Sequence, residues 1–172
     1  LIRDAEAHAH RFGWDTSRHY AVPTTDLAVH KIPQLLTPIA TALQGSIRTL
    51  LHANFPESFD GDPLNMYVID CFLVKYSASK GQYHLPVHSD QSTHSLIIPL
   101  NDEDSYEGGG TLFVDAGLVV RPPQGHMLAF PGDVYHSGQP VLTGDRYILA
   151  FFHKYCSSSD LSFKKRPVME CM

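Results

Sequence analysis

The sequence predicts a mostly β domain with supporting helices, and three observations carry this prediction. After Pro63 the chain consists of short apolar or alternating runs that are rich in β-branched and aromatic residues. Glycine, proline, asparagine and aspartate separate these runs, and no helical period lies between them. One helical stretch precedes them. Many strands at nearly regular spacing are typical of an antiparallel sandwich or barrel, so we expect a jelly roll supported by a helix.

The predicted supporting helix runs from Ile32 to Asn54, after a mixed and polar start to the chain. In that start, "WDTSRHYAVPTTD" is expected to be an ordered loop, and the sequence assigns no role to residues 1–30. Thr37-Pro38 is expected to begin the helix, because proline is favoured at the first helical position, and "NFPESFDGDP" ends it. The apolar residues recur at three- and four-residue steps and predict one packing face. They are Leu35, Leu36, Ile39, Leu43, Ile47, Leu50 and Leu51.

The β part of the chain contains six predicted strands. Each is a short run bounded by turn-forming residues. In the first of them, Cys71 stands among apolar residues and is expected to be a small core residue. The six are Met66–Tyr76, His94–Leu100, Gly110–Ala116, Leu118–Pro122, His126–Gly132 and Arg146–Tyr155.

Composition excludes several classes of protein. A formal net charge of −5 leaves no basic surface for phosphates, so no nucleic acid is expected as a partner. No run approaches the roughly 18 apolar residues of a membrane span, so no membrane is expected either. Three cysteines without a CxxC motif indicate no disulfide framework. Because the chain begins at Leu1 and not at methionine, we expect an excised domain of undetermined compartment and oligomeric state.

Candidate metal ligands gather where a predicted core strand begins, in "HLPVHSDQSTHSLIIPLN" (residues 84–101). His88 and Asp90 are two residues apart, and such residues project to the same side of an extended chain. The candidate third ligand is His136 in "FPGDVYHSG", and its rival His126 suits an outward or capping role better. Two histidines and one carboxylate form the facial triad of non-heme Fe(II) oxygenases. A surface histidine and aspartate in a turn would give the same two letters, so the pair needs further support.

Arg146 supplies such support, because it opens the apolar run "RYILAFF" ten residues after His136. A guanidinium at the start of a buried strand is costly unless it meets an anion. Its planar fork can hold a carboxylate through two parallel hydrogen bonds. Pairing with a nearby acid, Asp145 or Asp133, is the alternative reading of this arginine.

Four features together resemble the catalytic domain of Fe(II)- and 2-oxoglutarate-dependent dioxygenases, in particular the prolyl 4-hydroxylase and procollagen lysyl hydroxylase branch. They are "HSDQSTHSLIIPLN", "YEGGGTLF", "FPGDVYHSGQPVLTGDRYILAFF" and the upstream Tyr76. The likeness covers about residues 66–155. It implies the double-stranded β-helix (jelly roll) of this superfamily and a single catalytic domain over residues 1–172. In this reading residues 1–65 are helical and loop support, and residues 156–172 are a C-terminal tail.

The resemblance also implies roles for the candidate residues. His88, Asp90 and His136 would bind Fe(II). Arg146, where many prolyl hydroxylases have a lysine, and Tyr76 would hold the distal carboxylate of 2-oxoglutarate. The implied reaction uses O2, converts 2-oxoglutarate to succinate and CO2, and hydroxylates an unactivated C–H, with ascorbate as the reductant that maintains the iron.

Other site chemistries agree less well with these residues. A zinc hydrolase built on His84 and His88 fails, because Pro86 interrupts a helix between them and no HExxH glutamate is present. His84 is instead expected near the mouth of the pocket. A halogenase of the same superfamily would lack the carboxylate of Asp90. Gly108–Gly110 are not a phosphate loop, because neither a lysine nor a helix follows, and they are expected to allow a tight turn.

Three questions of function stay open at this point. A nucleic-acid demethylase of the superfamily would show a second arginine where Phe152 stands, and a non-catalytic cupin-like module would not require both Arg146 and Tyr76. The substrate is expected to be a prolyl or lysyl residue of a protein or peptide, and the alternative is a free small molecule such as an amino acid. A peptide needs a groove, for which the loops Ser77–His84 and Asn101–Glu107 are candidates, and the second loop is acidic enough to attract a basic peptide.

Overall fold

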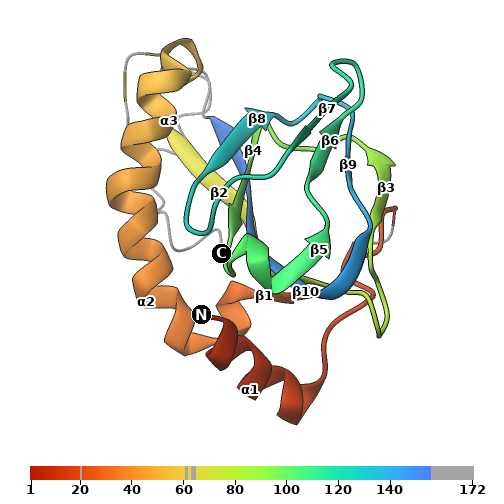
Figure 1. Ribbon diagram of the computed structural model, residues 1–172. Coiled ribbons are helices and arrows are strands. Elements are labelled where there is room, and N and C mark those ends of the chain that lie inside the picture. Colours follow the sequence, from red (N-terminus) through yellow and green to blue (C-terminus); the bar gives the residue numbers. More distant parts are fainter. Residues whose placement is uncertain (20, 61, 63–64, 156–172) are drawn as a thin grey trace.

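The computed structural model describes residues 1–19, 21–60, 62 and 65–155, in which two antiparallel sheets lie beside a helical layer (Figure 1). The helices cover the outer face of the larger sheet, and the smaller sheet lies on the opposite side (Figure 1). The predicted mostly β architecture with supporting helices is therefore confirmed. The predicted tail, residues 156–172, lies outside the described residues.

The larger sheet has the strand order β1-β2-β10-β4-β8, and β5 pairs with the first residues of β10. All its pairings are antiparallel, as predicted. Its two long strands, β2 and β10, pair along most of their length and form the centre of the fold. The strands are β1 (Asp26–Ala28), β2 (Met66–Ser77), β4 (His94–Pro99), β5 (Tyr106–Gly108), β8 (Leu128–Pro131) and β10 (Val141–Tyr155).

The smaller sheet has the order β3-β9-β6-β7, again with antiparallel pairs. Its strands are β3 (Leu85–His88), β6 (Thr111–Phe113), β7 (Leu118–Val120) and β9 (His136–Gly138).

All six predicted strands are present, but four further strands, β1, β3, β5 and β9, were not predicted. Each has only three or four residues, which is too short for an alternating pattern to be visible. The predicted start of the last strand was also wrong. Strand β10 begins at Val141 and not at Arg146, because its first residues pair with β5.

The helical run covers the predicted stretch but begins earlier than expected. The expected start at Pro38 was wrong, because the helix begins at Pro33 and Pro38 lies inside it. A proline there leaves the carbonyl of Gln34 without its helical hydrogen bond. Both residues are exposed, so water satisfies that carbonyl at small cost. The run consists of α2 (Pro33–Ala42), a π-helical turn (Leu43–Ile47) and α3 (Arg48–Asn54).

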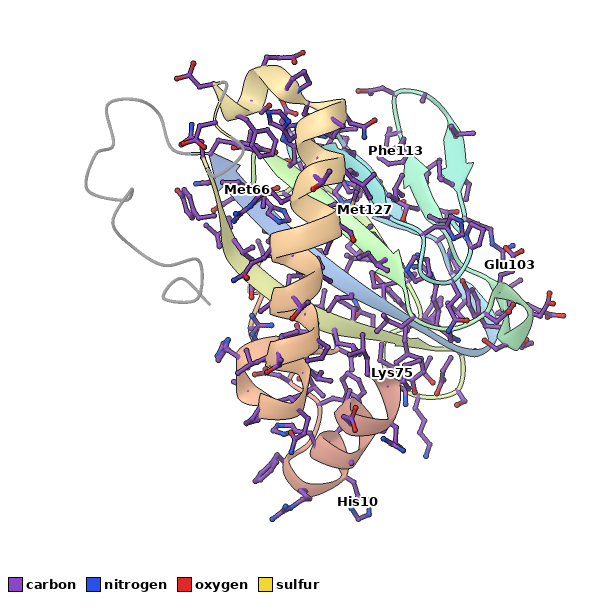
Figure 2. All side chains as sticks on the ribbon, turned by 90° about the vertical axis from the view of Figure 1, so that its left-hand side faces the viewer. His10, Met66, Lys75, Glu103, Phe113 and Met127 are labelled. Carbon is purple, nitrogen blue, oxygen red and sulfur yellow. The ribbon has the colours of Figure 1, made fainter. Side chains whose placement is uncertain are left out.

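The apolar face of this run packs on the larger sheet, in front of which it lies in Figure 2. Leu50 was predicted to belong to this face and is instead 47% exposed, while Leu36 is only partly buried. The face is therefore narrower than its sequence pattern suggested. Its buried residues are Leu35, Ile39, Leu43, Ile47 and Leu51.

A second helix, α1 (Ile2–Phe12), was not predicted. Glu6 fixes it to the sheet, because Lys75 of β2 donates a 2.8 Å hydrogen bond to Glu6 and the hydroxyl of Tyr147 donates another. No helix in the described part of the chain is long and apolar enough to cross a membrane. Short 3-10 turns occupy Val29–Lys31, Pro56–Phe59 and Glu103–Ser105.

Alternate residues of β2 and β10 face two different layers, as the two-residue period of a strand requires. Leu73 and Leu149 point to the helices, together with Cys71, which is buried as predicted. Their sequence neighbours Val74 and Ile148 belong to a second core cluster on the opposite side. That second side is the wall of a cavity, described next.

Candidate active site

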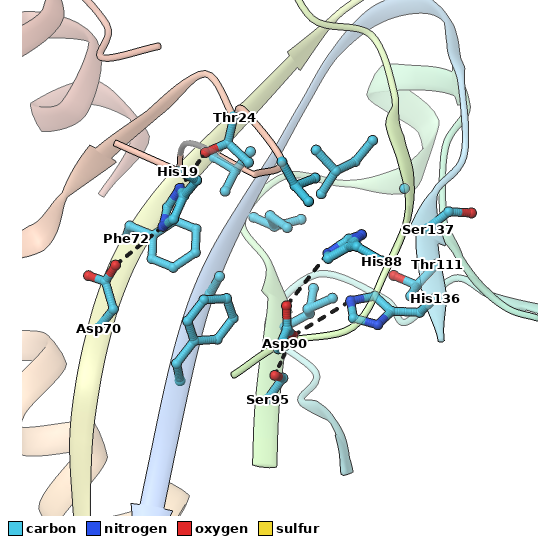
Figure 3. A pocket seen from close by; sticks show the side chains of 18 of the residues that line it. His19, Thr24, Asp70, Phe72, His88, Asp90, Ser95, Thr111, His136 and Ser137 are labelled. Carbon is cyan, nitrogen blue, oxygen red and sulfur yellow. Dashed lines mark hydrogen bonds and ion pairs between the residues drawn. The ribbon is translucent and has the colours of Figure 1, made fainter. Parts of the chain in front are cut away.

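A cavity of about 440 Å³ opens between the two sheets. The candidate metal ligands His88, Asp90 and His136 lie at one side of this cavity. His19 and Asp70 lie at the other side, next to Phe72 (Figure 3). Most of the wall that the larger sheet contributes is apolar. The apolar side chains of this wall include Phe72, Val74, Ile97, Ile148, Ala150 and Phe152.

His88, Asp90 and His136 come together in this cavity, with their ligand atoms all within 4.8 Å of one another. The pairing of β3 with β9 places His88 directly opposite His136, so the two rings lie 4.3 Å apart. Asp90 follows β3 at the predicted two-residue step. Its oxygens lie 3.5 Å from Nε2 of His88 and 3.6 Å from Nε2 of His136.

Hydrogen bonds hold these three side chains in orientation. Nδ1 of His88 donates to the carbonyl of Pro86 at 2.8 Å, and Nδ1 of His136 donates to the carbonyl of Val134 at 2.9 Å. Each histidine therefore presents the lone pair of Nε2 to the shared point, as metal-binding histidines do when a carbonyl fixes their other nitrogen.

The carboxylate of the cluster is fixed from two sides. The backbone N–H of Asp90 donates to the carbonyl of Gly132 at 2.7 Å, and the hydroxyl of Ser95 donates to Oδ2 of Asp90. Ser92 in turn contacts the Ser95 hydroxyl at 2.8 Å. The two oxygens of Asp90 face the two histidines, Oδ1 toward His88 and Oδ2 toward His136 (Figure 3).

The cluster fits a divalent first-row metal. Donor atoms about 2.1 Å from a metal and at right angles to one another lie about 3 Å apart, so the 3.5 and 3.6 Å separations between Asp90 and the two histidines would shorten by about half an ångström on metal binding. Burial lowers the pKa of His136, which favours the neutral imidazole that a metal requires. Two histidines and one carboxylate leave further coordination positions for exogenous ligands.

Arg146 and Tyr76 form a second pair on the cavity wall. They are direct partners across β2 and β10, and the guanidinium carbon of Arg146 lies 5.4 Å from the ring centre of Tyr76. Arg146 is only 2% exposed, yet no carboxylate pairs with it in the described part of the chain. Asp145, one of the predicted alternative partners, instead contacts Lys75 at 3.2 Å.

The environment of Arg146 and Tyr76 favours the binding of an anion. Nε of Arg146 is buried without a hydrogen-bond partner among the described residues, a costly arrangement for a charged group. Burial raises the pKa of Tyr76, so its hydroxyl stays protonated and able to donate. A carboxylate entering the cavity would satisfy both groups.

Glycines allow the chain to approach this pair closely. All three residues of Gly108–Gly110 have a positive φ, as the expected tight turn requires. A Cβ on Gly109 would lie 3.0 Å from Cδ of Arg146, and a Cβ on Gly138 would lie 3.1 Å from the hydroxyl of Tyr76. Two glycines far apart in the sequence thus give the two polar side chains their room.

Comparison with known proteins agrees with this geometry. The sequence profile described as the 2OG-Fe(II) oxygenase superfamily matches residues 71–154, a segment that contains the His-Asp-His cluster and Arg146. Residues 71–154 belong to that superfamily. The predicted resemblance to it is therefore confirmed.

Similar proteins include two lysine hydroxylases. Over 110 residues this chain is 34% identical to the human multifunctional procollagen lysine hydroxylase and glycosyltransferase, a match that covers 62% of this chain and 15% of the relative. Over 136 residues it is 32% identical to the procollagen-lysine,2-oxoglutarate 5-dioxygenase of Drosophila melanogaster, which covers 77% of this chain and 18% of that protein. The chain thus spans less than a fifth of the length of these relatives.

Solved structures support the fold. The collagen prolyl hydroxylase of Paramecium bursaria Chlorella virus-1 superposes with a TM-score of 0.61 at 17% identity, over 89% of this chain and 82% of that one. A prolyl-4-hydroxylase of Pseudomonas putida gives 0.60 at 14% identity, over 90% of this chain and 86% of that one. At these identities the likeness establishes the shared jelly-roll fold, as predicted.

Two other histidines of the oxygenase domain lie outside the cavity. His126, the rival third ligand, is exposed and precedes β8, in line with its expected outward position. His84, expected near the pocket mouth, is exposed, contacts the ring of Tyr83 with centroids 4.5 Å apart and does not itself line the cavity. It lies directly before Leu85, which points inward in its place.

The sequence did not reveal that the N-terminal segment closes one side of the cavity of this oxygenase domain. His19, Ala21, Val22 and Thr24 all line it, whereas neither of the loops proposed as groove elements contributes a side chain. The available signal was Asp70, a single carboxylate inside the apolar run "MYVIDCFLVKY". Such a group needs a cationic partner, and here it finds two from the segment to which no role was assigned.

Proposed function

We propose that this chain is an Fe(II)- and 2-oxoglutarate-dependent dioxygenase that hydroxylates an unactivated C–H on a prolyl or lysyl residue of a protein or peptide. The observation that carries the proposal is the convergence of His88, Asp90 and His136 with Arg146 on one cavity. The superfamily membership of residues 71–154 supports the chemistry. The hydroxylases among the similar proteins support the class of substrate.

Each cavity residue then has a defined task. His88, Asp90 and His136 would hold Fe(II), and Arg146 with Tyr76 would hold the distal carboxylate of 2-oxoglutarate. Iron held there would supply the chemistry by which O2 oxidises both 2-oxoglutarate and the C–H bond, so that R–H, O2 and 2-oxoglutarate give R–OH, succinate and CO2. We include ascorbate in the proposal as the reductant that maintains the iron.

The apolar wall contributes by excluding water and positioning the substrate. The part of the cavity between the three candidate metal ligands and its far end is lined by Phe72, Ile148 and Phe152. A hydrocarbon segment of a substrate fits this lining, because each buried CH₂ contributes roughly 0.8 kcal/mol. The wall thereby directs a C–H and not a polar group toward the iron.

The iron site is tested by Asp90→Ala. Purified protein supplied with Fe(II) should consume 2-oxoglutarate, and this variant should lose the activity because two neutral histidines alone hold the metal too weakly. The matched control is Asp133→Ala, which removes an exposed aspartate from the turn before His136 and should leave turnover unchanged. Turnover that survives in Asp90→Ala would refute the assignment.

The substrate class is tested with peptides that contain a single prolyl or lysyl residue. Mass spectrometry should find a product heavier by one oxygen atom in a reaction that depends on 2-oxoglutarate. If no peptide is modified while a free amino acid is hydroxylated, the peptide assignment fails and the oxygenase chemistry stands.

A further inference from the structure

The far end of the cavity carries a polar pair that the proposed iron chemistry does not use. His19, from the N-terminal segment, and Asp70, from β2, both line the cavity on the side away from the metal cluster (Figure 3). Their side chains are 22% and 24% exposed, so a ligand can reach both. His19 also packs its ring on Phe72 at 4.6 Å, which holds it against the wall.

The pair belongs to a network whose charges balance. Arg18 donates two hydrogen bonds to Asp70, at 2.9 and 2.7 Å, and another to Asp26. Nδ1 of His19 lies 2.7 Å from the hydroxyl of Thr24 and 3.1 Å from Asp26. The hydrogen bonds of His19 to Asp26 and Asp70 raise its pKa to about 9, so it is cationic at neutral pH.

Two cations and two carboxylates leave this end of the cavity with no net charge. The charged groups of a free amino acid would have to compete with the ion pairs that Arg18 and His19 already make with Asp26 and Asp70, so they would gain little here. A neutral group with one donor and one acceptor gains more. The peptide unit of a main chain is such a group.

The geometry of His19 and Asp70 allows a peptide unit to bind to both side chains. Nε2 of His19 lies 3.4 Å from Oδ2 of Asp70, longer than a good N–H···O hydrogen bond. The donor and the acceptor thus stand side by side with only a weak bond between them. A ligand that accepts from Nε2 and donates to the carboxylate replaces this weak bond with two better ones.

A second cavity, of about 240 Å³, begins at the same carboxylate. Ile69 and Asp70 line both cavities, and Arg18, His30 and Cys71 complete the second one. A chain that leaves the iron cavity past Asp70 therefore enters a further hollow. A free amino acid would not need this second space, whereas a peptide continues in at least one direction.

We propose that His19 and Asp70 dock one peptide unit next to the target residue, and that the neighbouring residue of the substrate occupies the second cavity. Nε2–H of His19 donates to a main-chain carbonyl, and the carboxylate of Asp70 accepts from a main-chain N–H. This inference rests on the proposed hydroxylation of peptides and names the element that distinguishes a peptide from a free amino acid.

The test compares a long and a short substrate in the wild-type protein and in variants. The long substrate is an acetylated and amidated pentapeptide with a central prolyl or lysyl residue, and the short one is the same residue as the free amino acid, which has no peptide unit. His19→Ala should raise KM for the pentapeptide about five- to tenfold, the loss of one hydrogen bond from a charged donor, with little change in kcat. KM for the short substrate should stay the same. His19→Gln, which keeps an N–H donor, should restore most of the affinity.

Lys31→Gln is the matched control, because Lys31 pairs with Asp15 at 3.3 Å in the same N-terminal part of the chain and lines neither cavity. If it reproduces the full effect of His19→Ala, or if His19→Ala changes kcat and both KM values alike, the pair is structural and the inference is overturned. Should His19→Ala not fold, the wild-type protein decides, because equal KM values for both substrates also overturn it. If wild-type protein hydroxylates no peptide at all, the proposed function fails as well, and this result distinguishes the two failures.

Discussion

The two faces of the central strand pair place similar residue types in opposite environments. On the helix side, Leu149 and Phe151 of β10 are buried in a continuous apolar core. On the cavity side, their neighbours Ile148 and Phe152 border an open space, which the buried side chain of Arg146 also lines. The helix-side face stabilises the fold through packing. The cavity-side face contributes less to packing and leaves space for a ligand.

Two histidines make the same contrast in electrostatic terms. His153, on the helix side, is fully buried, and burial lowers its pKa to about 3. His19, on the cavity side, is 22% exposed, and hydrogen bonds to Asp26 and Asp70 raise its pKa to about 9. Burial alone therefore does not decide the charge of a histidine here, since the presence of a carboxylate partner reverses the result.

The largest effect is expected at Arg146, the charged residue of the cavity face. Arg146→Met should raise KM for 2-oxoglutarate by about 100- to 1000-fold, because the variant cannot make the proposed buried ion pair with the cosubstrate carboxylate. Iron loading should stay nearly intact. Steady-state kinetics and metal analysis measure the two quantities separately.

Two further variants sharpen this result. Arg146→Lys should have an intermediate effect, because it keeps the charge but loses the planar fork. Arg121→Met, which removes an exposed arginine, should change nothing. An unchanged requirement for 2-oxoglutarate in Arg146→Met would refute the role of this arginine.

The packing contrast is tested by truncating one residue on each face. Leu149→Ala should lower the free energy of unfolding by about 2–4 kcal/mol, because it leaves a void in the helix-side core. Phe152→Ala should cost only about 1–2 kcal/mol, because its ring already borders an open cavity. The effects on KM for the peptide should be in the opposite order. Equal losses of stability in urea unfolding would mean that the two faces do not differ as described.

The charge contrast should appear as two separate limbs of the stability–pH curve. Below about pH 6.5, the unfolded chain binds a proton that buried His153 does not, so stability falls as the pH drops from there toward about 3. His94, whose pKa burial also lowers, acts in the same direction. His19 does the reverse, because its contribution is complete below about pH 6.5 and is lost as the pH rises through about 9.

Urea unfolding across this pH range separates the two limbs. His153→Leu should flatten the acid limb and leave the alkaline one, and His19→Gln should flatten the alkaline limb only. His126→Gln, at an exposed site, serves as the control. An acid limb that persists undiminished in His153→Leu would contradict the assignment.

The same contrast explains what the sequence predicts and what it does not. The helix-side face is continuous and local in its pattern, so the helical run and the long strands were predicted nearly completely. The residues proposed to bind the metal and 2-oxoglutarate were predicted from a sequence motif, and the cavity does bring His88, Asp90, His136, Arg146 and Tyr76 together.

Helix α1 was missed although it is a local element, but most of the missed features depend on partners that are remote in the sequence. Strands β3 and β9 have too few residues for a period and exist because they pair with each other. The bond between Arg18 and Asp70 spans 52 residues, and nothing local to "RHYAVPTTD" indicates that it meets β2. Pro38 gave a wrong prediction for the opposite reason. The local preference of proline for the first helical position did not hold, because its solvent-exposed site tolerates a proline inside the helix.

The smallest expected effect concerns the space beside Tyr76. Gly138→Ala introduces a methyl group 3.1 Å from the Tyr76 hydroxyl and from Cβ of Leu85, a contact tight enough to displace the hydroxyl by a few tenths of an ångström. Because hydrogen-bond strength depends on such distances, KM for 2-oxoglutarate should rise about threefold, with little loss of stability. The matched control is Gly45→Ala, where nothing lies within 4 Å and the helix should gain up to about 1 kcal/mol. A KM in Gly138→Ala equal to that of the control would mean that the Tyr76 hydroxyl does not contact the cosubstrate, and Arg146 alone would then hold it.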